Sequence, residues 1–129
     1  DGGHYQVERV LLEQDHSVQM IRRPEALRHA LKAYAFYYYG ASMEPRYFQG
    51  EMGIADPTKP ARPGDFVVVP LTDGNGPDIM TVLVKQLVRE TSAYVELRQF
   101  NPPMDFRIPR EQIAGKLHRI LPSNEIHGA

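Results

Sequence analysis

The chain has 129 residues and a formal net charge of −1, with 15 Lys and Arg against 16 Asp and Glu. This length suits one domain with its own core. The balanced charge argues against this segment being the main DNA-binding surface, because phosphate binding needs an excess of basic residues. Cysteine is absent, which excludes disulfides, thiolate metal sites and a cysteine nucleophile. No apolar run is long enough to span a membrane, so we expect a cytoplasmic protein, and no pattern requires a cofactor.

Short β-type runs separated by Gly, Pro and Asp turns dominate the chain and predict a mainly β fold. One short helix fits residues 24–31, with Pro24 in its first turn, and the eleven prolines argue against long helices. In chain order, the predicted strands cover residues 18–22, 34–39, 52–55, 65–71, 80–89, 93–97, 106–109 and 112–121.

A serine lies where the second of these strands runs into a turn, in the segment YGASMEP at residues 39–45. This placement can expose the Ser42 hydroxyl at the edge of a sheet, close to backbone N–H groups, as a nucleophile with an oxyanion hole requires. The more common role of a turn serine is to bond to the backbone, and the turn by itself does not decide between the two.

A lysine lies inside the apolar segment TVLVKQLV at residues 81–88. A period of two places Lys85 on one face with Leu83 and Leu87, while valines line the other face. Both faces are apolar, so we expect Lys85 to be buried, which lowers its pKa and makes a neutral amine available as a base. The alternative is an edge-strand lysine that reaches water or pairs with a carboxylate.

The runs GASMEPRYFQGE, PARPGDFVVV and TVLVKQLV, in this order, resemble the LexA-like or S24-type peptidase domain found at the C-terminus of phage-type repressors. The resemblance covers roughly residues 21–121. It implies a mainly β, LexA/signal-peptidase-like compact fold of several small twisted sheets with one short helix, over residues 21–122. Residues 1–20 would be a lead-in or linker remnant, and residues 123–129 a C-terminal tail.

The resemblance also assigns site residues. It implies that Ser42 is the nucleophile, that its backbone N–H is an oxyanion donor, and that Lys85 is the general base, while Met43 packs to hold the turn. Ala41 stands where the family often has a polar residue, and Glu51 where Asp is more common. Neither departure affects the serine–lysine pair.

The function implied is self-cleavage of a transcriptional repressor in its own linker, which separates a DNA-binding domain from a dimerisation domain. The implied partners are a second copy of the chain, joined through the closing strand at residues 113–121, and DNA, bound through a helix-turn-helix domain upstream. A recombinase filament on single-stranded DNA would trigger cleavage in the SOS response, and no membrane takes part. The chain does not begin with Met, and we expect such upstream residues in the parent gene.

Several alternatives stay open. Self-cleaving members cut an Ala-Gly or Cys-Gly bond upstream of the serine, and no such dipeptide occurs between Asp1 and Ser42. Ala114-Gly115 lies in a predicted strand, which argues against it as the cleaved bond. Either the cleavage segment lies further upstream, or the domain is a catalytically silent dimerisation module. The lack of an anchor segment disfavours a membrane signal peptidase of related fold.

Other residue patterns favour structural roles. Five histidines lack metal-ligand spacing, which argues against a metal site. The aromatic residues at 36–39, 47 and 48 fit a core or a dimer interface better than a base-stacking platform, because no basic excess accompanies them. Glu44 fits a solvated turn residue, since a serine–lysine pair needs no carboxylate.

Overall fold

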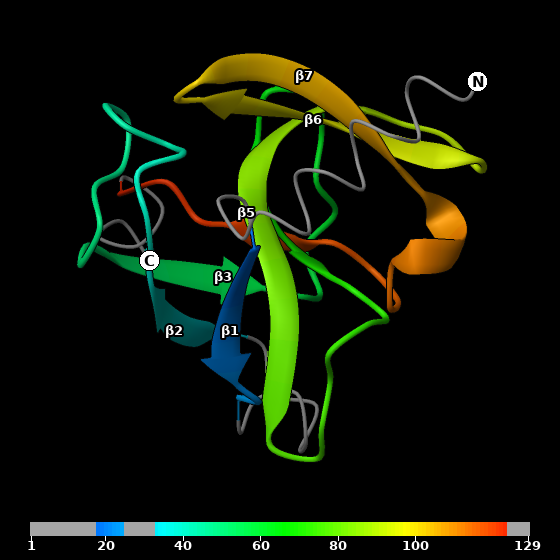
Figure 1. Cartoon of the computed structure of the whole chain (residues 1–129), viewed down its shortest axis with the longest axis horizontal. Coiled ribbons are helices and arrows are strands. Elements are labelled where there is room, and N and C mark those ends of the chain that lie inside the picture. Colours follow the sequence, from blue (N-terminus) through cyan, green and yellow to red (C-terminus); the bar gives the residue numbers. More distant parts are fainter. Residues whose placement is uncertain (1–17, 25–32, 124–129) are drawn as a thin grey trace.

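The computed structural model describes residues 18–24 and 33–123, which form an antiparallel sheet of eight strands (Figure 1). The strand order is β2-β3-β8-β4-β5-β6-β7, and β1 pairs with β5 outside this path. This confirms the mainly β fold, with the strands joined by hydrogen bonds into one continuous sheet. The strands are β1 (Val18–Arg22), β2 (Tyr34–Tyr37), β3 (Met52–Asp56), β4 (Phe66–Pro70), β5 (Ile79–Glu90), β6 (Tyr94–Phe100), β7 (Pro103–Pro109) and β8 (His118–Ile120).

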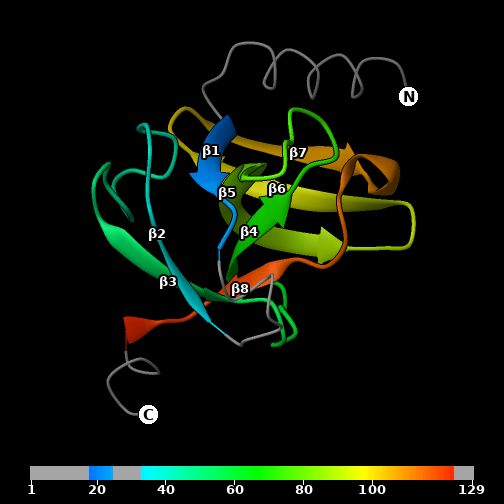
Figure 2. The same ribbon diagram turned by 90° about the horizontal axis from the view of Figure 1, so that it is seen from below.

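Strand β5, with 12 residues, is the longest strand of the sheet and pairs with three others. Its first part pairs with β1 along one edge and with β4 along the other, and its last part pairs with β6 on the edge that β1 has left. A register shift between Leu87 and Arg89 marks a bulge in the β5–β6 ladder. Figures 1 and 2 show β5 running from the β1 side of the molecule to the β6–β7 hairpin. One strand therefore connects both ends of the domain.

The two faces of β5 line two different cores, as the period-two pattern predicted. Leu83 and Leu87 face a mainly aliphatic core, which we call the aliphatic core, and Val82 and Val84 face the other, which we call the aromatic core. The buried members of the aliphatic core are Val67, Val69, Leu71, Leu83, Leu87, Val95, Leu97, Phe106, Ile108, Ile113 and Leu117. Those of the aromatic core are Tyr34, Phe36, Tyr38, Ala55, Val68, Met80, Val82, Val84 and Ile120.

The aromatic core is built from alternate residues of β2 and its continuation. Phe36 and Tyr38 are buried, whereas Tyr37 and Tyr39 are exposed. Phe36 pairs with Gly53 of β3, and a Cβ atom at position 53 would lie 2.6 Å from the Phe36 ring, so only glycine fits under these rings. The expectation that this aromatic segment packs in a core is confirmed for its buried half.

The predicted closing strand at residues 112–121 is wrong over most of its length. A 3-10 turn, η1 (Arg110–Gln112), is followed by an isolated bridge between Ile113 and Leu71, and only β8 is a true strand. Gly115 has φ +88, outside the conformation of a regular strand, and neither it nor Lys116 pairs with another strand. The Ala114-Gly115 bond therefore lies in an exposed connection, and the argument that a strand protects it from cleavage does not hold.

Smaller differences concern strand ends. The predicted strand 34–39 keeps regular pairing only to Tyr37, and the one predicted at 106–109 begins at Pro103. The predicted helix at 24–31 lies outside the described residues, apart from Pro24. No helix in the described part of the chain is long and apolar enough to cross a membrane.

Candidate active site

The segment that carries Ser42 forms a compact turn between β2 and β3. Gly40 has φ +81, which favours glycine, and its N–H donates to Gln49 Oε1 at 2.9 Å. The Glu44 N–H donates to the Ala41 carbonyl oxygen at 3.1 Å and closes the turn around the serine. Met43 is only 3% exposed, in agreement with the expected packing role.

Ser42 is also tied to the far end of β6. Its carbonyl oxygen accepts hydrogen bonds from the backbone N–H groups of Phe100 and Asn101, both at 2.9 Å. Among the described residues, no group accepts a hydrogen bond from the Ser42 N–H. The serine is thus held through its carbonyl oxygen, and its N–H remains available.

Lys85 lies in the middle of β5, opposite Val67 of β4, and is fully buried. It shares the aliphatic face of β5 with Leu83 and Leu87. Its Nζ donates to Ser42 Oγ at 2.7 Å. Removal from water lowers the pKa of Lys85 from 10.5 to about 7, because the apolar surroundings disfavour the ammonium ion.

The structure brings together the two side chains that the sequence singled out. The complete burial of Lys85 rules out the alternative of an edge lysine that reaches water. Ser42 is 8% exposed, so its hydroxyl lies at the boundary between the core and the surface. A serine hydroxyl and a buried lysine amine at this distance can act chemically as a nucleophile and its base, with no third acidic residue needed.

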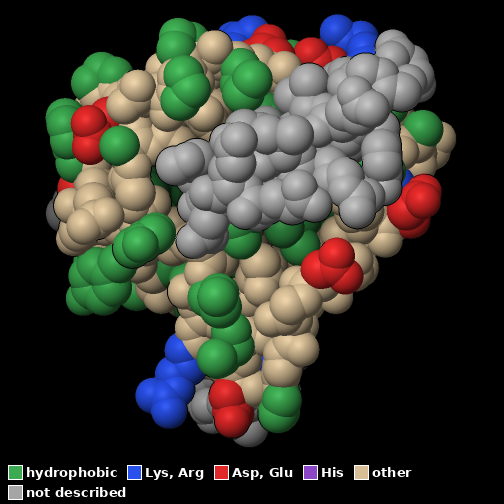
Figure 3. Space-filling model, viewed as in Figure 1, with side chains coloured by type: hydrophobic (Ala, Val, Ile, Leu, Met, Phe, Trp, Pro, Cys, Tyr) green, Lys and Arg blue, Asp and Glu red, His purple; other side chains and the backbone are tan. Residues whose placement is uncertain are grey.

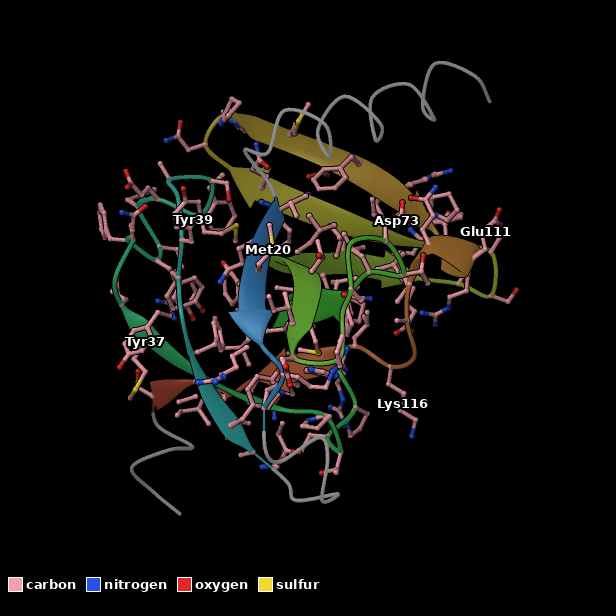
Figure 4. The ribbon with its side chains drawn as sticks, turned by 60° about the horizontal axis from the view of Figure 1, so that its bottom comes forward. Met20, Tyr37, Tyr39, Asp73, Glu111 and Lys116 are labelled. Carbon is pink, nitrogen blue, oxygen red and sulfur yellow. The ribbon has the colours of Figure 1, made fainter. Side chains whose placement is uncertain are left out.

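A surface groove lies next to the turn that carries Ser42. It is lined by residues 18–22 of β1 on one side and residues 35–39 on the other, and we call it the β1–β2 groove. A small hollow lined by Ser42 and Val84 adjoins it and shares Gln19, Tyr38 and Tyr39 with it. Figure 4 shows Met20 on β1, and Tyr37 and Tyr39 on the segment opposite. These three side chains are 63–69% exposed, so apolar groups flank the groove.

Side-chain and backbone contacts of β1 fix this wall of the groove. The ladder with β5 holds the strand, and the Arg23 N–H donates to the Asp78 carbonyl oxygen at 2.7 Å. The Arg23 guanidinium donates to the Gly76 carbonyl oxygen at 3.2 Å. Gln19 is buried and bonds to the opposite wall. Sequence reasoning did not single out Gln19; the one signal was a polar residue at an inward position of a predicted strand.

The remaining candidates lie away from the pair. Among the described residues, no group of three or more His, Asp or Glu side chains could hold a metal ion. His118 is buried on β8 with Tyr34 Oη 2.5 Å from its Nδ1, and desolvation lowers its pKa to about 4. Glu44 is half-buried in the turn.

Comparison with known proteins identifies the class. The family model described as Peptidase S24-like matches residues 5–117, and the chain belongs to this family. Repressor protein C of Rhizobium phage 16-3 is 37% identical over 100 residues. The aligned region covers 76% of this chain but only 38% of that repressor, so the chain spans well under half of the relative's length. No solved structure matches significantly.

Proposed function

We propose that this chain is the C-terminal dimerisation and self-cleavage domain of a phage-type transcriptional repressor, with Ser42 as nucleophile and Lys85 as general base. The observation that best supports this proposal is the 2.7 Å hydrogen bond between Lys85 Nζ and Ser42 Oγ at the edge of an apolar core. A pKa near 7 leaves about half of the lysine neutral at neutral pH, which a general base requires.

The reaction is acyl transfer to Ser42. Neutral Lys85 takes the proton from the Ser42 hydroxyl as Oγ attacks the carbonyl carbon of the cleaved bond, and the Ser42 N–H donates to the oxyanion that forms. Lys85 then gives its proton to the leaving amine as the C–N bond breaks. In the second half, Lys85 takes a proton from water, the hydroxide attacks the ester, and the proton returns to Ser42 Oγ.

The β1–β2 groove is the proposed path of the substrate. Its walls end at the hollow that contains Ser42, and a peptide in extended form fits between two strand-like segments. We propose that the linker of the same protein occupies this groove. A linker upstream of residue 1 would supply the cleaved bond, since none of the expected dipeptides lies between Asp1 and Ser42.

The similarity to a phage repressor supports the repressor context, and the near-neutral charge supports a separate DNA-binding domain. We therefore propose homodimers that bind DNA through an upstream helix-turn-helix domain, with a recombinase filament as trigger. The apolar side chains expected to join two copies, Ile113, Leu117 and Ile120, are at most 7% exposed and pack in the chain's own core. A dimer would have to use other side chains.

Labelling with a fluorophosphonate tests the pair directly. This small probe reacts with an activated serine and does not depend on the linker. We expect one label at Ser42, located by peptide mass spectrometry, with a rate that rises about tenfold between roughly pH 6 and pH 8 as Lys85 loses its proton. Ser42→Ala and Lys85→Ala should each lower labelling by at least about a thousandfold.

Ser92→Ala and Lys116→Ala are matched controls, because both side chains are exposed, and they should label like the wild type. Label retained in Ser42→Ala would show that the assignment is wrong. A wild-type domain that stays unlabelled even at alkaline pH would instead support a silent dimerisation module. Self-cleavage of the full-length repressor, with and without Ser42, then tests the natural reaction.

A further inference from the structure

Residues 37–39 continue β2 as an extended segment. The backbone groups on its two edges have different hydrogen-bond partners. Toward β3, the Tyr38 N–H donates to the Glu51 carbonyl oxygen, and the Tyr38 carbonyl oxygen accepts from the Gly50 N–H, both at 2.9 Å. The neighbouring groups, the Tyr37 carbonyl and the Tyr39 N–H, therefore point to the opposite edge, since backbone groups alternate along a strand. That edge faces the β1–β2 groove.

The Gln19 carboxamide occupies both of these groups. Its Nε2 donates to the Tyr37 carbonyl oxygen at 2.8 Å, and its Oε1 accepts from the Tyr39 N–H at 3.3 Å. In a parallel ladder, one residue bonds in the same way to the carbonyl of one partner residue and to the N–H two residues further on. The side-chain amide thus stands in for one residue of a parallel strand.

The same side chain lines the hollow at the nucleophile. Gln19 is 8% exposed and borders both the β1–β2 groove and the space beside Ser42. An extended peptide that pairs with residues 37–39 next to Ser42 needs the two backbone groups that Gln19 holds. Gln19 and such a peptide cannot bond to these groups at the same time.

We propose that Gln19 is an autoinhibitory side chain: its amide closes the strand-pairing edge of residues 37–39, and a peptide substrate must displace it to reach Ser42. The inference rests on the proposed peptidase function for its biological meaning, although the competition for Tyr37 and Tyr39 exists without any chemical step. It implies that cleavage is slowed by one residue of β1 and is accelerated when that residue is removed or turned away.

The test compares an extended probe with a small one. Acetyl-Ala-Ala-Ala aldehyde, a strand-forming peptide that traps an activated serine, is the extended probe, and the fluorophosphonate is the small one. In Gln19→Ala and in Gln19→Met, which keeps the volume without the amide, we expect the aldehyde to inhibit labelling at about fivefold lower concentration, roughly the effect of one net hydrogen bond. Fluorophosphonate labelling without the aldehyde is measured in each variant, so that a change in aldehyde affinity is read separately from a change in the reactivity of Ser42.

Met20→Ala is the matched control. Met20 lies next to Gln19 on β1, is 69% exposed, and lines the same groove without bonding to Tyr37 or Tyr39. It should leave the aldehyde affinity unchanged or weaken it. A fall in both aldehyde affinity and fluorophosphonate rate in the Gln19 variants would overturn the proposal, since it would mean that Gln19 supports the Ser42 segment. Unchanged affinity would overturn it as well.

Amide hydrogen exchange separates this proposal from the peptidase proposal. In Ser42→Ala protein, the Tyr39 N–H should exchange faster when Gln19 is also replaced, and acetyl-Ala-Ala-Ala-amide should slow it again by strand pairing. If the wild type never reacts with fluorophosphonate, the peptidase proposal fails, and this exchange experiment still decides the role of Gln19. No change in Tyr39 exchange would refute the autoinhibitory contact alone.

Discussion

The two cores on either side of β5 differ in what they do for the site. The aliphatic core is built largely on the β5–β6–β7 meander, whose strands are neighbours in sequence, and it lies on the face of β5 that carries Lys85. The aromatic core lies under β2 and β3, where the strands meet long connections, and it supports the segment that carries Ser42. Figure 3 shows hydrophobic side chains at the surface on the left of the view. The connection between β2 and β3 lies on this side (Figure 1) and carries the exposed Phe48.

Under the proposed function, this difference would separate two requirements of the reaction. A base with a lowered pKa needs dry, apolar surroundings, which a regular aliphatic core supplies. A nucleophile must meet substrate, which requires an exposed segment beside a groove. The 2.7 Å contact between Lys85 and Ser42 joins the two regions at their boundary.

The largest effects are expected when a cavity is created in each of the two cores in turn, next to β5. Leu83→Ala removes a fully buried side chain on the face of Lys85, and we expect it to lower the free energy of unfolding by about 3 kcal/mol. Water that enters near Lys85 should raise its pKa toward the free value. The pH midpoint of fluorophosphonate labelling should then move upward, which a pH series measures together with urea unfolding.

Val82→Ala is the control on the opposite face. Val82 is also fully buried but belongs to the aromatic core, so the variant should lose about 2 kcal/mol while its labelling midpoint stays near that of the wild type. Equal midpoint shifts in both variants would show that the two cores do not act separately on Lys85.

The second prediction concerns the energetic cost of Lys85 itself. Its folded pKa of about 7 lies below the unfolded value, so between roughly pH 7 and pH 10.5 the unfolded chain binds the extra proton. The free energy of unfolding should therefore rise with pH through this window. Below the window, the folded state bears the full cost of burying charged Lys85. Lys85→Met removes this cost, and we expect it to add about 2 kcal/mol at neutral pH while abolishing labelling.

Thermal or urea unfolding over the pH range checks this sign. The wild type should gain stability relative to Lys85→Met steadily between about pH 7 and pH 10.5, and the difference should become constant near about pH 11, where lysine is neutral in both states. A wild type that is more stable than Lys85→Met at every pH would mean that the hydrogen bond to Ser42 outweighs the desolvation of Lys85.

The smallest effects come from two buried tyrosines of the aromatic core. The Tyr38 hydroxyl is buried near Tyr47 but makes no hydrogen bond of normal geometry among the described residues, whereas the Tyr34 hydroxyl contacts His118 at 2.5 Å. We expect Tyr38→Phe to raise the free energy of unfolding by about 0.5–1 kcal/mol, and Tyr34→Phe to lower it by about 1 kcal/mol. Urea unfolding curves should show changes of opposite sign for the two variants, which would confirm that only the Tyr34 hydroxyl stabilises the fold. A lower free energy of unfolding in both variants would contradict this.

The sequence predicted the burial of Lys85 because both faces of its strand are apolar, and the period of two correctly separated Leu83 from Val82. That Ser42 would lie against Lys85 came from family resemblance alone, since the contact joins residues 43 positions apart. Gln19 could not be identified as a groove residue, because its partners are backbone groups at Tyr37 and Tyr39, and backbone groups are the same in every sequence.

The strand predicted at residues 112–121 shows where prediction from the sequence pattern failed. A mixture of apolar and basic residues predicted a strand through 112–121 with a bend or bulge at Gly115, but such a pattern does not reveal that the chain leaves the strand and changes direction there. The bond from the Ala114 N–H to the Pro70 carbonyl oxygen and the positive φ of Gly115 carry the chain from one part of the sheet to another before β8 begins. Turn geometry at a single glycine overrode a pattern that several residues supported.

The two hydrogen bonds that Phe100 and Asn101 donate to the Ser42 carbonyl oxygen also have a consequence for timing during synthesis. Ser42 lies in the first third of the chain, Lys85 follows on β5, and the groups that tie down the serine come only at the end of β6. A nascent chain cannot complete this arrangement until Asn101 has left the ribosome exit tunnel. Reactivity at Ser42 would therefore report that the sheet has been assembled through β6. If the proposed self-cleavage occurs, the parent protein would be protected from cutting itself while it is still being made.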